Sequence, residues 1–213
     1  MTPAPLTLSA LLAFASATGF VLCARLAVRG TSEAGGARLS LAAFWLGAAA
    51  VAAIQGARSL SALLGADSFA LIRALDQAAT PAYCMAAGGM VYYVAYILTG
   101  RSTLAIPIGL YYVVMVPVLR YPVELARPVG YAVGEWNVNL VYEGSLASPQ
   151  YTLALALAAV PMWASVLAYA SLLAHTPEPA ARYRIACMSV GLLLWVGAEV
   201  VVWATGLAAT PAG

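Results

Sequence analysis

Residues 152–174 read TLALALAAVPMWASVLAYASLLA, and no charged side chain interrupts them. A helix needs roughly 20 apolar residues to cross the hydrocarbon core of a bilayer, so this stretch is long enough to span one. The whole chain of 213 residues shares this character, because 63% of its residues are hydrophobic and only 8% are charged. Since an average soluble domain is about one quarter charged, the composition indicates an integral membrane protein.

The distances between consecutive charged residues predict more spans of the same kind. Residues 39–57, 77–100 and 102–119 carry no charge, and Glu199 is the one charge inside the last apolar stretch. Residues 121–149 are too polar and too rich in Gly and Pro to span, so they are expected to form a loop outside the membrane. We predict an all-α, polytopic transmembrane bundle in a single domain, residues 1–213, with six spans at 6–28, 39–60, 72–99, 102–120, 150–174 and 184–207.

Arginine is distributed unevenly between the two ends of these predicted spans. The connections after the first, third and fifth spans hold Arg25, Arg29, Arg38, Arg101, Arg182 and Arg184, whereas the opposite ends hold Arg58, Arg73, Arg120 and Arg127. The positive-inside rule places the first set in the cytoplasm. Both termini and the 121–149 loop are then outside, and the chain is expected in a bacterial-type cytoplasmic (inner) membrane. The first span has no positive segment before it, so we do not interpret it as a cleaved signal peptide.

Composition and motifs exclude several classes of function. A net charge of +2 is far too small for a nucleic-acid-binding surface. The three cysteines form no CxxC pair and His175 is the only histidine, so we expect no metal site and no cofactor. The chain also lacks a P-loop, a dinucleotide fingerprint, a GxSxG elbow and an HExxH pair. We therefore expect a protein without catalytic activity.

Ionisable side chains inside the spans are the best indicators of a site, because each costs about 2.5–3.5 kcal/mol to insert unless it meets a partner, a cavity or water. In the segment IRALDQAATPAY, the residues Arg73, Asp76 and Gln77 lie on one helical face, a spacing that favours an Arg73–Asp76 ion pair. Arg58 ends the preceding span at the same level. Glu199 is expected in the outer half of the membrane, paired with Arg58 or Arg73. Together these side chains predict a polar-floored pocket that opens to the outside. Snorkelling to the interface is the alternative role for Arg58, Arg73 and Asp76.

Four aromatic residues are predicted near the middle of their spans: Tyr111, Tyr112, Trp163 and Trp195. They could form the wall of an apolar ligand site, although packing in the core is the commoner use of such rings. Small residues in the runs AFASATG, GAAAVAA and AAGG recur at spacings of three and four, which lets helices approach closely.

Part of the chain resembles the seven-helix sensor region of bacterial membrane histidine kinases. The resemblance rests on FWLGAAAVAAIQGARSL, IRALDQAATPAY and YYVAYILTGR, followed by GEWNVNLVY in the long loop and by PAARYRI. It extends from Leu39 to Val202. It implies a membrane sensor, here without the seventh span and the catalytic domain, so a signal would pass to a separate partner.

A weaker likeness is to the microbial rhodopsins. RALDQAATP is similar to their third helix, and LLLWVGAEVVVW is similar to their sixth. The Thr-Pro step stands one residue closer to the acid than in that family, and the chain has no lysine for a retinal Schiff base. Covalently bound retinal is therefore excluded.

These observations favour a non-catalytic membrane protein, sensor-like or an accessory subunit of a membrane complex. It would bind a small or lipidic ligand, a membrane partner or a second copy of itself, through Arg58, Arg73, Asp76 and Glu199. A solute transporter or the substrate-binding subunit of an uptake system is the alternative, in which Ala13 and Ala17 would dock an energising partner. A purely structural subunit, in which the buried charges merely pair, is a third possibility.

Overall fold

Five helices are long and apolar enough to cross a membrane within the part of the chain that the structure describes. The structure is a computed structural model that describes residues 4–29, 35–144 and 148–179, with residues 182, 183, 185, 186, 189, 190 and 193. The helices are α1 (Ala4–Arg29), α2 (Gly35–Leu63), α3 (Phe69–Thr99), α4 (Ala105–Leu125) and α5 (Pro149–Ser171), with short 3-10 turns at Ser102–Leu104 and Leu172–Ala174. The predicted sixth span, 184–207, lies mostly outside the described residues. The structure thus supports five spans, and the N-out/C-out orientation stays a prediction.

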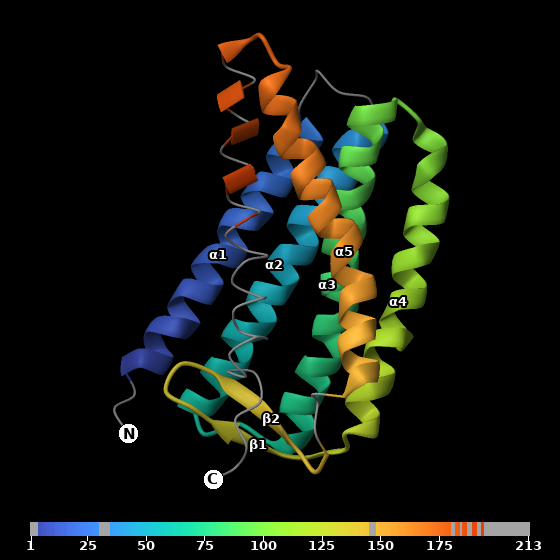
Figure 1. The fold of residues 1–213 in the computed structure, drawn as a ribbon. Coiled ribbons are helices and arrows are strands. Elements are labelled where there is room, and N and C mark those ends of the chain that lie inside the picture. Colours follow the sequence, from blue (N-terminus) through green and yellow to red (C-terminus); the bar gives the residue numbers. More distant parts are fainter. Residues whose placement is uncertain are drawn as a thin grey trace.

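The helices run alternately up and down, as Figure 1 shows. α1 packs along α2, α2 along α3, and both α4 and α5 pack against α3. The start of α1, the α2–α3 connection, the end of α4 and the start of α5 therefore lie at one end of the bundle, which we call the hairpin end after the β-hairpin found there. α3 is the central helix because it packs against α2, α4 and α5.

Small residues bring α2 and α3 into close contact. A Cβ atom on Gly89 would stand 2.6 Å from the backbone nitrogen of Phe44, and one on Gly47 would stand 2.6 Å from that of Ala86. No side chain larger than hydrogen fits at either position. The prediction that small residues in these two segments let the helices approach closely is confirmed.

α1 and α4 are less enclosed than the other three helices, and α2 is the main neighbour of α1. Ala17 is buried, and it lines an apolar groove between α1 and α2 together with Phe14 and Ala49. The Ala17 face is therefore already covered by α2. Ala13 is half-buried, and its role in docking an energising partner stays a prediction.

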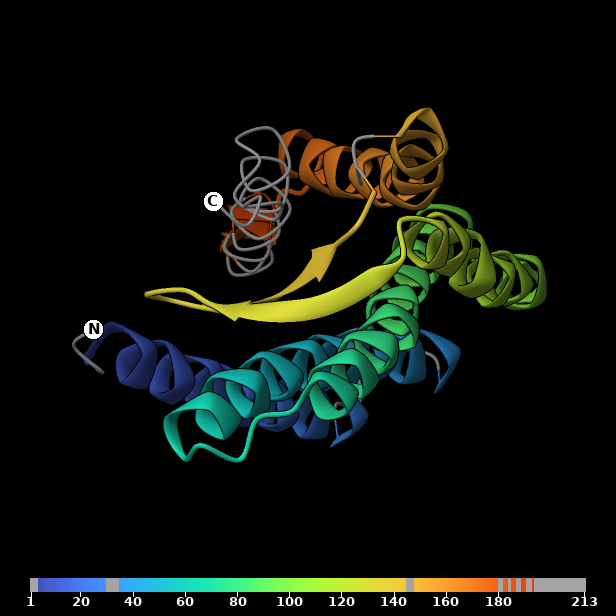
Figure 2. The ribbon, with the colours of Figure 1, turned by 90° about the horizontal axis from the view of Figure 1, so that it is seen from below.

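The connection between α4 and α5 is not an irregular loop, which corrects the all-α prediction. It holds an antiparallel hairpin of β1 (Pro128–Val133) and β2 (Val138–Tyr142). The turn at its tip is closed by the Gly134 nitrogen, which donates to the Asn137 carbonyl over 2.8 Å. Figure 2 shows the hairpin crossing the end of the bundle, between α1–α3 on one side and α5 on the other.

The hairpin has an apolar underside that holds it on the bundle. Val138 and Leu140 are buried in one cluster with Leu6 of α1 and Ile72 of α3. Val138 and Leu140 are two residues apart, and the strand period of two places both on the same face. The alternation within NVNLVY therefore fixes which face meets the helices.

α4 extends past its predicted end at residue 120 and reaches Leu125. The charged residues Arg120 and Glu124 do not end the span, because both have ion-pair partners within the bundle. The helix ends where Arg127 adopts a φ of 53°, a left-handed conformation that is uncommon outside glycine. This backbone turn directs the chain from α4 into β1.

Candidate ligand-binding site

Five charged side chains form one continuous series of ion pairs at the hairpin end of the bundle. Arg58 of α2 donates to Asp76 Oδ1 of α3 over 3.0 Å. Arg120 of α4 donates to Asp76 Oδ2 over 2.6 Å and to Glu124 over 2.5 Å. Arg73 of α3 donates to the second oxygen of Glu124 over 2.6 Å. The order Arg58, Asp76, Arg120, Glu124, Arg73 alternates in sign, and we call this set the charge series.

The charge series connects three helices and becomes more exposed along its length. Arg58 and Arg120 are 12% and 14% exposed, and Asp76 between them is 23% exposed. Arg73 and Glu124, at the other end, are both 39% exposed. The buried part therefore joins α2, α3 and α4, whereas the Arg73–Glu124 pair lies at the surface.

The predicted pairing of Arg73 with Asp76 is wrong. Both residues lie on α3, but Asp76 faces α2 and α4 while Arg73 reaches Glu124 on α4. The sequence did place Arg58, Arg73 and Asp76 at one level, and the structure brings all three into the charge series. It missed Arg120 and Glu124. Their spacing of four residues on a helix was the available signal.

A cavity of about 300 Å³ lies beside the buried part of the charge series, and we call it the Asp76 pocket. Asp76 and Arg120 supply its charged groups. Four further residues bring hydroxyl groups, and five aliphatic ones complete the wall. These are Thr80, Tyr83, Tyr142 and Tyr151, followed by Val51, Ala79, Leu119, Val123 and Leu155. Four helices and the hairpin thus contribute to one pocket.

The hairpin covers this pocket through Tyr142, the last residue of β2. Burial, and then the negative charge of Asp76, raise the pKa of Tyr142 above its ordinary value. A second tyrosine attaches the hairpin farther along, since a hydrogen bond with Asp67 in the α2–α3 connection raises the pKa of Tyr131. Tyr142 therefore stays neutral and can act as a hydrogen-bond donor to a group in the pocket.

Four predicted site residues that the structure describes, Gln77, Tyr111, Tyr112 and Trp163, do not line the Asp76 pocket. Gln77 is exposed on α3, and Trp163 is partly buried against a core cluster that includes Tyr112 and Met162. Glu199 and Trp195 lie outside the described residues, so the predicted pairing of Glu199 with Arg58 or Arg73 stays a prediction. Tyr111 and Tyr112 have another role.

The hydroxyl groups of Tyr111 and Tyr112 bind backbone carbonyls of α5. Tyr111 donates to the Leu157 carbonyl over 2.6 Å, and Tyr112 donates to the Ala158 carbonyl over 3.2 Å. Residue 161 would normally supply the helical N–H for the Leu157 carbonyl, but Pro161 has none. Tyr111 thus satisfies the carbonyl that Pro161 frees, as a proline inside a membrane helix requires.

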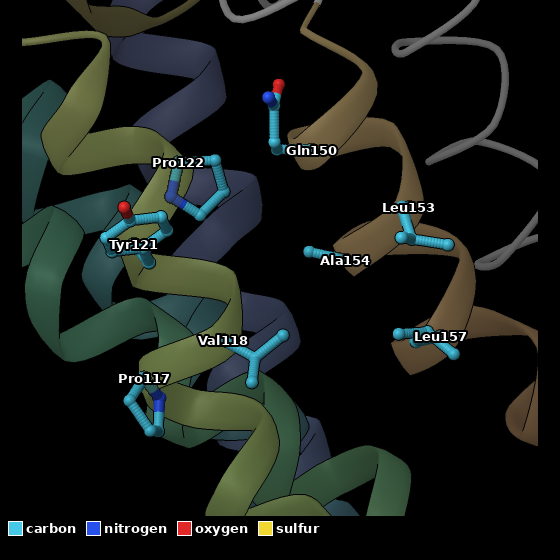
Figure 3. Close-up of a pocket in the computed structure, with 8 residues that line it drawn as sticks. All are labelled: Pro117, Val118, Tyr121, Pro122, Gln150, Leu153, Ala154 and Leu157. Carbon is cyan, nitrogen blue, oxygen red and sulfur yellow. The ribbon is translucent and has the colours of Figure 1, made fainter.

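A second hollow lies between α4 and α5 and is almost wholly apolar. It measures about 380 Å³, and Figure 3 shows Pro117 and Val118 of α4 on one side and Leu153 and Leu157 of α5 on the other. Leu153 is 62% exposed. We interpret this groove as surface that faces lipid, because it contains no charged group.

Comparisons with protein-family models, with curated proteins and with solved structures give no match for this chain. The geometry of the chain's own residues therefore carries the functional argument. That geometry offers a polar cavity with guanidinium and hydroxyl donors beside a carboxylate, an arrangement suited to binding.

Proposed function

We propose that this chain is an integral membrane protein that binds a small or lipidic ligand in the Asp76 pocket. It would act as a sensor-like or accessory subunit of a membrane complex, together with a protein partner or a second copy. The observation that carries the proposal is that Asp76 and Arg120 both reach a cavity of about 300 Å³ inside an otherwise apolar bundle. Ligand pockets commonly combine apolar walls with a few polar groups, and ionisable residues within membrane spans commonly mark functional sites.

The proposal is tested by filling the pocket without changing its charges. Ala79 lines the pocket, whereas its neighbour Ala78 is exposed on α3. We expect native mass spectrometry of the purified protein to show a noncovalently bound species in the wild type and in Ala78→Phe. The species should be lost in Ala79→Phe. Equal occupancy in both variants, or no bound species in the wild type, would contradict the proposal.

We further propose that the hairpin end faces the outside of an inner membrane. The support is the excess of arginine at the opposite end, which holds Arg29 and Arg101. Single cysteines introduced at Trp136 and at Arg101, in a variant without native cysteines, should label from opposite sides. Only the cysteine at Trp136 should react with an impermeant thiol reagent added to intact cells. Labelling of the cysteine at Arg101 alone would reverse the orientation.

A further inference from the structure

The charge series has more donors than acceptors. Its three arginines and two carboxylates leave one positive charge in excess. All four carboxylate oxygens already accept a hydrogen bond from an arginine. An added cation would find no unused carboxylate oxygen in the series, whereas an added anion would find guanidinium groups with donors to spare.

Two further donors of the charge series, on arginines that do not line the pocket, are also unsatisfied. The Nε atoms of Arg58 and Arg73 are buried and have no hydrogen-bond partner among the described residues. A buried donor without an acceptor is unfavourable, and a charged one more so. The series is therefore incomplete as a set of hydrogen bonds, and what it lacks is acceptors.

We propose that the Asp76 pocket binds a monoanion, with a carboxylate or phosphodiester group against Arg120 and a small apolar body between the aliphatic and tyrosine side chains. This inference rests on the function proposed above and names the chemical class of the ligand. Arg120 is the contact residue because it lines the pocket, which Arg58 and Arg73 do not. Arg58 acts as a positioning residue that neutralises Asp76, so that Asp76 does not repel the anion.

The size and walls of the pocket limit the body of this ligand. A volume of about 300 Å³ equals that of roughly ten water molecules, and a cavity of about half this size holds one benzene ring. Leu119, Val123 and Leu155 supply apolar contacts. Tyr142 and Thr80 can donate hydrogen bonds to oxygen atoms of the anion. A single ring or a short acyl chain carrying one acid group fits these limits.

The test compares three probes of nearly equal shape and different charge. These are phenylacetate, neutral phenylacetamide and cationic phenethylamine, added to the full chain in an uncharged detergent. At ten times its Kd, phenylacetate should raise the Tm by about 3–6 °C, and the other two should shift it by less than about 1 °C. An equal shift with phenylacetamide would overturn the anionic class but leave binding in the pocket intact.

Two arginine variants locate the binding group. Arg120→Gln should weaken the binding of labelled phenylacetate by about ten- to hundredfold, because a charge-assisted hydrogen bond is lost. Arg127→Gln makes the same change of charge at a side chain that is 77% exposed on the hairpin, and should leave the Kd within about twofold. Equal losses in both variants would overturn the assignment to Arg120.

A third variant predicts a gain of binding, which misfolding cannot produce. Asp76→Asn removes a carboxylate that competes for the same guanidinium groups, so phenylacetate should bind more tightly, by about threefold or more. Weaker binding in Asp76→Asn would overturn the proposal. So would binding that appears only in Glu199→Gln, because the chain's own carboxylate would then be the anion.

Reconstitution separates the two sources of such an anion. Nanodiscs of phosphatidylcholine with phosphatidylglycerol should raise the Tm relative to phosphatidylcholine alone if the anion is a lipid phosphodiester, and phenylacetate should then compete. If phenylacetate binds and phosphatidylglycerol has no effect, the source is a soluble acid. The proposed function and this inference fail together only if two results coincide. No probe binds, and native mass spectrometry shows the same bound species in Ala79→Phe as in Ala78→Phe.

Discussion

Neutralising Asp76 should destabilise the bundle much more than neutralising Glu124. Each carboxylate bridges two arginines, so Asp76→Asn and Glu124→Gln remove the same charge and the same number of ion pairs. They differ in burial. Asp76 is 23% exposed between arginines that are 12% and 14% exposed, whereas Glu124 and its partner Arg73 are both 39% exposed.

The magnitude follows from this difference in burial. Breaking a buried ion pair by removing one partner costs about 3–5 kcal/mol, because the other charge stays buried without compensation. Since the residues around Asp76 are partly exposed, we expect Asp76→Asn to lower the free energy of unfolding by about 2–4 kcal/mol. An exposed pair contributes about 0–1 kcal/mol, so Glu124→Gln should cost about 1 kcal/mol or less. Arg120 keeps Asp76 as its partner in that variant.

The assay is unfolding by sodium dodecyl sulfate in mixed micelles, followed by tryptophan fluorescence. Glu143→Gln serves as the control, because Glu143 is 60% exposed and pairs only across the hairpin with Arg127, which is 77% exposed. The control should change the free energy of unfolding by less than about 0.5 kcal/mol. If Asp76→Asn costs no more than Glu124→Gln, burial does not set the strength of these pairs, and the reasoning fails.

Three further predictions concern the packing and the hairpin. Gly89→Ala should destabilise by about 1–3 kcal/mol because its Cβ would stand 2.6 Å from a backbone nitrogen, whereas Gly109→Ala, with nothing within 4 Å, should not destabilise the protein in the same assay. Tyr111→Phe should lower the free energy of unfolding by about 1 kcal/mol in the wild-type background. In a Pro161→Ala background, where the backbone N–H is restored, the same substitution should have almost no effect. Because the pKa of Tyr142 is raised in the folded state, its contribution to stability should be complete below about pH 10 and decline above it. Tyr142→Phe should remove that part of the decline in a pH series of unfolding curves.

The positions of the five described helices could be predicted from the sequence because the energetic rule is simple. A charge inside the hydrocarbon core is costly, so uncharged stretches of about 20 residues identify helices without reference to their neighbours. The same rule placed Arg58 and Asp76 at one end of the bundle. It could not choose their partners, because it does not give the direction in which each side chain leaves α3, Asp76 toward both α2 and α4 and Arg73 toward α4. That direction depends on how α3 packs between α2 and α4.

The hairpin shows a different limit of reasoning from composition. Its Gly, Asn and Glu residues indicate a segment outside the membrane, and that conclusion is compatible with either a loop or a sheet. The alternation of apolar and polar residues in NVNLVY was the available signal for a strand. A pair of strands alone is marginally stable in water, so the hairpin depends on packing against the helices beneath it. Leu6 and Ile72 cover the face that Val138 and Leu140 present.

The binding function that we propose gives the charge series a role beyond stability. Replacing a buried ion pair by apolar side chains of similar volume is often neutral or stabilising, so a bundle that needed only to hold α2, α3 and α4 together could do so without charges. Glycine packing already joins α2 to α3, and Tyr111 and Tyr112 already join α4 to α5. In the proposed function, the excess positive charge of the three arginines would be matched by an acceptor that enters the pocket beside Arg120.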